Sequence, residues 1–174
     1  MAKTSGGVRT LKTGSREYST RELEVIKMRE IGLYSSVEFS KKGGGYVAVE
    51  KSTMKHKPEE LEAAGFLADK GYKVTLKDEA GEFKTPDGKI FSYFFEQHTP
   101  SIDKNSAKHF SNSLEHAKVK KADIALVYMK TSGHTKKSVI DGIKEYESHK
   151  TNIHRFKQII IVTKDGRVHK HRHN

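Results

Sequence analysis

The sequence of 174 residues contains no cysteine and no tryptophan, and it has only three prolines. The absence of cysteine excludes disulfide bonds, thiolate metal sites and cysteine nucleophiles. No run of about eighteen apolar residues occurs, so the sequence predicts no membrane-spanning helix. The first residues also lack the apolar segment of a secretory signal peptide, which fits a soluble chain or a segment carried by a larger protein.

Positive charge is abundant. Lysine and arginine number 33 against 22 aspartates and glutamates, which gives a formal net charge of +11. An excess of this size favours polyanionic partners, with nucleic acid ahead of anionic membranes and acidic proteins. The length allows one domain with an appendage rather than two ordinary domains.

The first 57 residues predict a tail and a small accessory region. Residues 1–18 are rich in Ser, Gly and Lys and predict a flexible basic tail. In residues 19–57, Ser19 and Glu22 form a capping-box pattern that predicts a helix from about residue 20 to 31. Two alternating segments around the triple glycine at 43–45 then predict a β-hairpin with a flexible turn, since no P-loop lysine and helix follow these glycines.

Residues 58–174 predict the main domain. Pro58 and Gly71 suit the two ends of a helix over about 58–70. The remaining patterns predict a strand at 72–78, two strands about the "PDG" turn within 81–98, a helix at 105–122, a strand at 123–129, a helix at 135–149 and a hairpin at 158–173. We therefore expect an α/β fold with a central mixed β-sheet flanked by helices, built on an αβββαβ core.

One acid lies among apolar residues on the helix at 58–70. At 100° per residue, Glu60 falls within the stripe that contains Leu61, Ala64, Leu67 and Ala68. A carboxylate that faces a core must be neutralised, paired or bound to a cation, because burying it alone costs several kcal/mol. The alternative is a partly solvated glutamate in the first helical turn, stabilised by the helix dipole.

Two more acids flank the apolar strand within "TPDGKIFSYFFEQHTPS". Side chains alternate along a strand, so Glu96 and His98 project from the same face. Asp87 lies in the "PDG" stretch before that strand. Each feature also has an ordinary explanation, because the strand can simply end in solvent at "EQHTPS" and "PDG" is common turn chemistry.

Taken together, Glu60, Asp87 and Glu96 could hold one hard cation, and we expect Mg²⁺ or another divalent cation. A divalent cation favours the ionised forms of clustered carboxylates, which would otherwise repel one another. It also polarises a phosphate and activates bound water, so this pattern predicts metal-dependent cleavage of phosphodiester bonds.

The order of these residues resembles the PD-(D/E)XK nuclease superfamily, and within it the C-terminal tRNA-cleaving toxin domains of contact-dependent growth inhibition proteins. The resemblance covers about residues 57–164 and implies that Glu60, Asp87 and Glu96 bind the metal ion. The superfamily usually has a lysine two residues after the second acid, and this chain has His98 there. The resemblance therefore implies that His98 replaces the lysine that activates water, which histidine can do near neutral pH.

The same resemblance implies that tRNA is the substrate, that a larger secreted protein delivers the domain into bacterial cytoplasm, and that an acidic immunity protein neutralises it. Two other hypotheses remain. One is a catalytically inactive nucleic-acid-binding module of this fold, attached to a phage or mobile-element protein. The other is a metal-free ribonuclease that uses His98 and Glu96 as acid and base.

Basic residues gather near several predicted element ends and are candidates for phosphate contacts. The candidates are Lys118, Lys120, Lys121, Lys136, Lys137, Arg167, Lys170 and Arg172. Alternate histidines at 169, 171 and 173 share one face of the last predicted strand. Without further ligands at suitable spacing, a contact to phosphate is favoured there over a transition-metal site.

Overall fold

The computed structural model describes residues 9–52, 55–78, 85–100, 107–130 and 134–173. The elements in chain order are α1 (Arg16–Ile31), β1 (Tyr34–Phe39), β2 (Tyr46–Glu50), α2 (Pro58–Ala68), β3 (Lys73–Leu76), β4 (Gly88–Ile90), β5 (Tyr93–His98), α3 (Ala107–Val119), β6 (Ile124–Met129), α4 (Lys136–Ser148), β7 (Gln158–Thr163) and β8 (Val168–His171). Among the described residues, no helix combines the length and the apolar character needed to cross a membrane.

The chain forms two compact units. Unit 1 comprises residues 1–80 and 88–92, and unit 2 comprises residues 81–87 and 93–174. Each contains parallel and antiparallel strand pairs together with two helices. The predicted α/β class, with mixed β-sheet flanked by helices, is thereby confirmed, and the order of elements after residue 58 is the predicted one.

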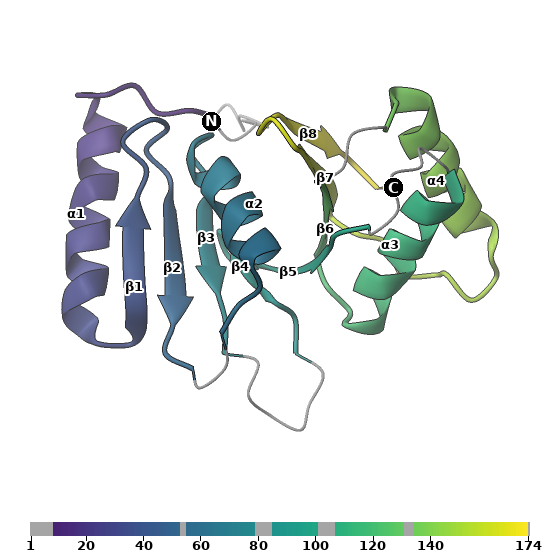
Figure 1. The fold of residues 1–174 in the computed structure, drawn as a ribbon, viewed down its shortest axis with the longest axis horizontal. Helices are drawn as coiled ribbons and strands as arrows, with labels where there is room; N and C mark the ends of the chain where they lie inside the picture. Colours follow the sequence, from purple (N-terminus) through teal and green to yellow (C-terminus); the bar gives the residue numbers. More distant parts are fainter. Residues whose placement is uncertain (1–8, 53–54, 79–84, 101–106, 131–133, 174) are drawn as a thin grey trace, which may run out of the picture. The chain divides into compact units, whose positions relative to one another are not determined.

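In unit 1, the strands follow the order β1-β2-β3-β4 (Figure 1). β1 and β2 form the predicted antiparallel hairpin, β2 pairs with β3 in parallel, and β3 pairs with β4 antiparallel. The parallel pair is connected through α2, so β2, α2 and β3 make one βαβ unit. The predicted boundary between residues 57 and 58 falls inside this unit.

The first helix begins earlier than predicted. Ser15, rather than Ser19, caps it, because the Ser15 side chain accepts a hydrogen bond from the Tyr18 backbone N–H at 3.2 Å. Ser19 therefore lies within α1. The sequence offers two serines at suitable positions, and the burial of Tyr18 at 6% exposure favours the earlier start.

The triple glycine is required by close packing as well as by the turn. A Cβ on Gly43 would lie 2.0 Å from the Asp69 carbonyl oxygen, and a Cβ on Gly45 would lie 2.3 Å from the Tyr72 carbonyl oxygen. The Gly45 N–H donates to the Ala68 carbonyl at 3.0 Å. These glycines are buried, so the segment that turns the chain between β1 and β2 also packs closely against the α2–β3 turn.

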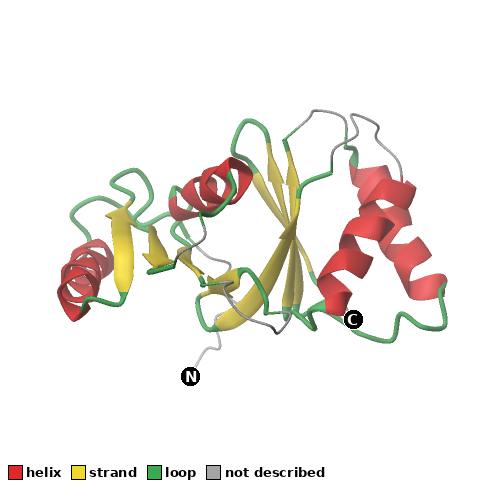
Figure 2. Ribbon diagram, turned by 60° about the horizontal axis from the view of Figure 1, so that its bottom comes forward, coloured by secondary structure: helices red, strands yellow, loops and turns green. Residues whose placement is uncertain are grey.

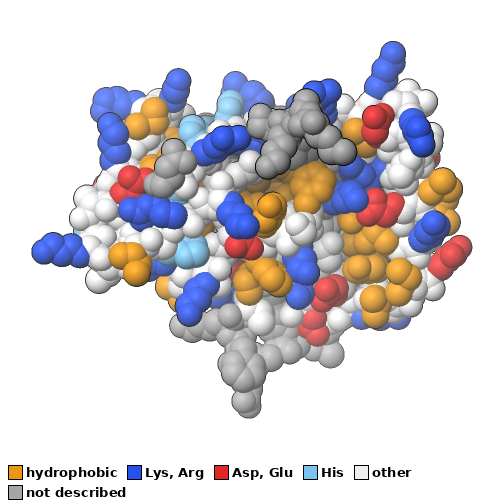
Figure 3. Space-filling model, turned by 180° about the vertical axis from the view of Figure 1, so that it is seen from behind, with side chains coloured by type: hydrophobic (Ala, Val, Ile, Leu, Met, Phe, Trp, Pro, Cys, Tyr) orange, Lys and Arg blue, Asp and Glu red, His pale blue; other side chains and the backbone are white. Residues whose placement is uncertain are grey.

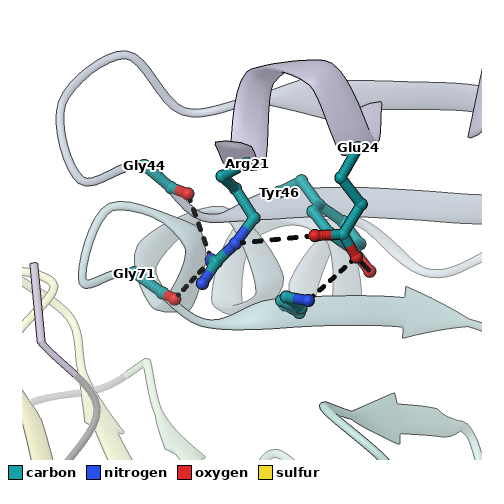
Figure 4. A network of polar contacts seen from close by, with 6 residues as sticks. Arg21, Glu24, Gly44, Tyr46 and Gly71 are labelled. Carbon is teal, nitrogen blue, oxygen red and sulfur yellow. Dashed lines mark hydrogen bonds and ion pairs between the residues drawn. The ribbon is translucent and has the colours of Figure 1, made fainter. Parts of the chain in front are cut away.

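Arg21 reinforces the same region (Figure 4). Its Nη1 donates to the carbonyls of Gly44 and Gly71 at 3.1 and 3.0 Å, so α1 is tied to both turns. Its Nε lies 3.8 Å from Glu24, whose other oxygen is 2.9 Å from Lys73 Nζ. Burial lowers the pKa of Arg21, and the Glu24 carboxylate opposes that shift.

In unit 2, the strands follow the order β5-β6-β7-β8. β5, β6 and β7 are parallel, and β8 is antiparallel to β7. α3 and α4 pack against each other, and α3 contacts β5 and β6, so the helix pair covers one face of these strands (Figure 2). β6 is almost wholly buried, as its continuous apolar sequence predicts.

The turn between the second and third strands of the predicted core lies later in the sequence than expected. The chain turns at Phe91 and Ser92 rather than at the "PDG" stretch, so Asp87 immediately precedes β4. Phe91 adopts a positive φ of 53°, which is unusual for a bulky residue and gives no turn signal in the sequence. Residues 81–84 of the predicted strand before "PDG" lie outside the described residues.

Candidate active site

The structure brings Asp87 and Glu96 together within unit 2. The Asp87 backbone N–H donates to Glu96 Oε2 at 3.2 Å, and the Gln97 backbone N–H donates to Asp87 Oδ2 at 2.7 Å. Asp87 is 5% exposed and Glu96 is 3% exposed. Two backbone-to-carboxylate hydrogen bonds therefore hold two buried acids side by side, although the turn that places them differs from the predicted one.

Lys120 compensates the charge of this acid pair. Its Nζ lies 3.4 Å from Glu96 Oε1 and also donates to the Thr85 carbonyl at 2.9 Å. Lys120 follows the last residue of α3, so a helix end delivers it to the strand that carries Glu96. The sequence predicted Lys120 as a phosphate contact, and only the packing of α3 beside β5 shows that it reaches the acid.

His98 leaves β5 toward α3, two residues beyond Glu96. Its Nδ1 lies 2.8 Å from Ser113 Oγ, and the Ser113 hydroxyl donates to the His109 carbonyl at 3.1 Å. Because a hydroxyl carries one proton, a Ser113 hydroxyl that donates to the His109 carbonyl can only accept from Nδ1 of His98. In that tautomer the ring proton is on Nδ1, and Nε2 is the basic nitrogen of the neutral ring.

A second histidine, His116, lies beside His98 and the acid pair. The two imidazole rings are 4.9 Å apart between centroids, and His116 Nε2 lies 3.6 Å from Glu96 Oε1. The His116 side chain is 52% exposed, whereas that of Glu96 is 4% exposed. Neither His116 nor Ser113 was predicted, and their single signal in the sequence is the spacing that puts both on one face of α3.

Glu60 belongs to unit 1, where it has a local role. As the third residue of α2, it accepts a hydrogen bond from the Lys57 backbone N–H at 2.7 Å, which ties the start of α2 to the residue before it. His56 Nδ1 lies 3.4 Å from Glu60 Oε2. The alternative of a first-turn glutamate thus describes its contacts in α2, and a role for Glu60 beside the acid pair stays a prediction.

The predicted phosphate-contact residues differ in their surroundings. Lys118 Nζ donates to Asn152 Oδ1 at 2.5 Å, Lys137 pairs with Asp141 at 2.6 Å, and Arg167 Nε lies 3.0 Å from Asp165. The other exposed members of the set are Lys121, Lys136, Lys170 and Arg172. On the face shown in Figure 3, Lys and Arg side chains are widely spread, and the histidines visible there lie among them.

The donor chemistry of Asp87 and Glu96 fits Mg²⁺. This ion is often held by one or two carboxylates, with water and substrate oxygens completing its shell. Among the described residues, no group of three or more His, Asp or Glu side chains is arranged to hold a metal ion. The predicted Mg²⁺ therefore stays a proposal, with these two acids as its protein ligands.

One solved structure with this fold is a chain of the CdiA-CT/CdiI toxin and immunity complex from Burkholderia pseudomallei, at a TM-score of 0.54 and 18% identity. The likeness shows a shared fold. The match covers 71% of this chain and 98% of that chain. No protein family and no curated protein matches the sequence.

Proposed function

We propose that the chain is a nuclease toxin that cleaves phosphodiester bonds in RNA, with tRNA as its substrate. The observation that carries this proposal is the buried Asp87–Glu96 pair with Lys120 Nζ 3.4 Å from Glu96. A lysine beside two acids is what the PD-(D/E)XK pattern requires. His98 occupies the usual lysine position in the sequence, and Lys120 supplies the ammonium group from α3 instead.

Each residue has a role in the proposed reaction. Asp87 and Glu96 would hold Mg²⁺, which supplies Lewis-acid activation of phosphate and water when bound. Lys120 would stabilise the negative charge that develops on the phosphate in the transition state. His98, whose Nδ1 lies 2.8 Å from Ser113 Oγ, would act as the acid–base group toward water or a ribose hydroxyl.

The assignment as a toxin draws on the solved neighbour and on charge. That neighbour belongs to a toxin and immunity complex, which contains both an effector and its inhibitor. The net charge of +11 favours the effector for this chain, because RNA is a polyanion. An acidic immunity protein would then be its partner, and a larger secreted protein would carry it to the target cell.

Two alternatives have specific support. The contacts of Glu96 with Lys120 and His116 also suit a structural ion pair, which favours an inactive RNA-binding module. The 4.9 Å approach of His98 and His116 favours a metal-free ribonuclease that works by acid–base catalysis.

The deciding experiment incubates the purified chain with total tRNA and with plasmid DNA, each in Mg²⁺ and in EDTA. We expect tRNA cleavage in Mg²⁺, loss of cleavage in EDTA, and a loss of about a hundredfold or more in Glu96→Gln. Glu145→Gln, which removes an acid from α4 away from the pair, serves as the matched control and should retain activity. Equal cleavage in EDTA would favour the metal-free enzyme, and intact nucleic acid in every tube would favour the binding module.

A further inference from the structure

A cluster of histidines and cations lies in unit 2 outside the acid pair. We call it the histidine cluster, and it comprises His134, Lys136, Arg167, His169 and His171. His169 and His171 alternate on β8 and so share a face of this strand. The His134 ring, just before α4, lies 6.2 Å from the His169 ring, and Arg167 comes from the β7–β8 turn.

The members of the cluster act on one another electrostatically. Burial lowers the pKa of His134, and His169 and Arg167 lower it further, against the weaker opposing effect of Asp165. Burial likewise lowers the pKa of His171, with His169 and Lys136 acting in the same direction. Asp165, an acid beside the cluster, lies 3.0 Å from Arg167 Nε.

Lys136 and Arg167 make the charged forms of the neighbouring histidines unfavourable in the free protein, and an external anion would relieve that repulsion. A transition metal is a poor occupant, because the described residues include no group of three or more ligating side chains set to bind one. A row of phosphates suits the site better. β8 is extended, so the side chains of His169 and His171 lie along a line that begins at Arg167, rather than around one point.

We propose that the histidine cluster binds the phosphodiester backbone of RNA and takes up protons when it does so. The proposal rests on the proposed function, since it takes RNA as the target, but it uses none of the residues of the acid pair. It adds His134 and the uptake of protons to the phosphate contact that the sequence already favoured for His169 and His171.

The direction of the pH dependence follows from linkage. In the free protein, the neighbouring cations favour neutral histidines, whereas bound phosphates favour the imidazolium forms. Binding therefore raises the proton occupancy, and RNA affinity increases as the pH falls through the neutral range. The increase ends when the pH is below the lowered pKa values of His134 and His171, because the free protein is then charged as well. Among the described residues, the charged groups that act on His134 and His171 are Lys136 from α4 and Asp165 and Arg167 from the β7–β8 turn.

The test measures binding of fluorescent tRNA to the full chain carrying Glu96→Gln, at fixed salt from pH 8 to pH 5.5. Uptake of about one proton gives a tenfold gain in affinity for each unit by which the pH falls. We therefore expect the logarithm of the affinity, plotted against decreasing pH, to rise with a slope of about one near pH 6.5. Replacing all three histidines of the cluster by glutamine should remove this slope. His149→Gln removes an exposed histidine at the end of α4 and should leave the slope unchanged.

The proposal is overturned if the pH dependence of RNA affinity persists in the triple glutamine variant. It is also overturned if polyglutamate binds as tightly as tRNA and in the same histidine-dependent way, because the surface would then be assigned to an acidic protein. Thermal melts of both variants, measured at pH 8, show whether the fold is retained. The two proposals fail separately. If tRNA is never cleaved but binding shows the histidine-dependent slope, the nuclease assignment fails and the docking surface stands. If tRNA is cleaved and the slope ignores these histidines, the docking surface alone fails.

Discussion

Arg21 illustrates at the scale of one residue how a half-buried charge stabilises this fold. Its guanidinium is bonded to two turn carbonyls and lies beside Glu24, so removing it leaves buried acceptors without this donor. We expect Arg21→Ala to lower the free energy of unfolding by about 2–3 kcal/mol. Urea unfolding measures this value, and Arg16→Ala, an exposed arginine on the same helix, should stay within about 0.5 kcal/mol of the parent. Equal losses in the two variants would contradict the proposed role of the two carbonyl bonds.

His173 gives a second residue-scale prediction, on pH. Its Nδ1 accepts the Phe156 backbone N–H at 3.0 Å, and its Nε2 lies 2.9 Å from Glu147. Burial lowers the pKa of His173, and the Glu147 carboxylate only partly opposes this. The unfolded chain, with an ordinary histidine pKa of about 6.5, therefore binds more protons than the folded chain at mildly acidic pH.

Folding stability should consequently decline as the pH falls from about 7 through the lowered pKa of His173. In His173→Gln, stability should be lower at pH 7 but should depend less on pH, since glutamine can accept the Phe156 N–H without titrating. Urea midpoints at pH 5, 6 and 7 provide the measurement, with His149→Gln as the exposed control. Identical pH profiles for His173→Gln and the parent would refute this account.

Sequence reasoning at this scale predicted Asp87, Glu96 and His98 but neither Ser113 nor His116. Acids flank one apolar strand, and strand alternation puts Glu96 and His98 on the same face. Lys120 was predicted only as a phosphate contact, because a lysine at a helix end gives no signal for an acid partner. Its distance from Glu96 depends on how α3 crosses β5, which no local pattern records.

At the scale of elements, some glycines are needed because a Cβ would collide with neighbouring backbone, whereas others have room for a side chain. A Cβ at Gly45 would meet the carbonyl oxygens of Tyr72 and Ala68 at 2.3 and 2.4 Å, whereas a Cβ at Gly65 in α2 would meet nothing within 4 Å. We expect Gly45→Ala to destabilise the chain by about 2–3 kcal/mol through overpacking. Gly65→Ala should instead stabilise it by about 0.5–1 kcal/mol, because alanine is the better helix former.

Thermal unfolding of the Gly45→Ala and Gly65→Ala variants tests this prediction, and changes of opposite sign in Tm are expected.

The sequence predicted the elements better than their ends. Periodicity predicted the order of helices and strands, since these follow from local burial. The cap at Ser15 and the turn at Phe91 escaped prediction, because a second serine matched the capping pattern better and Phe91 gives no turn signal.

At the scale of the whole molecule, the predicted α/β class was correct, while the two compact units divide the chain elsewhere than at residue 58. The reason is the parallel pairing of β2 with β3, from Tyr46 with Lys73 to Val49 with Leu76. This pairing unites elements that lie on both sides of the predicted boundary. Composition and local pattern give no measure of such contacts, because parallel partners are separated by a whole helix.

The charge of +11 supports a last prediction, on the response of the chain to RNA and salt. Ligand that binds only the folded state at about a hundred times its Kd adds about 2.7 kcal/mol of stability, which corresponds to a Tm increase of about 5–10 °C for a chain of this size. We expect tRNA to raise the Tm of the Glu96→Gln chain by this amount in about 50 mM salt, as followed by tyrosine fluorescence.

In about 0.5 M salt the increase should vanish, because each lysine or arginine that contacts a phosphate displaces a counterion, and several such contacts reduce affinity by orders of magnitude. A neutral polymer of similar mass serves as the control for crowding, which contributes less than about 1 kcal/mol. A Tm increase that persists in high salt would show that base stacking or apolar contacts dominate binding, and no increase in low salt would remove RNA as the partner that the charge of this chain predicts.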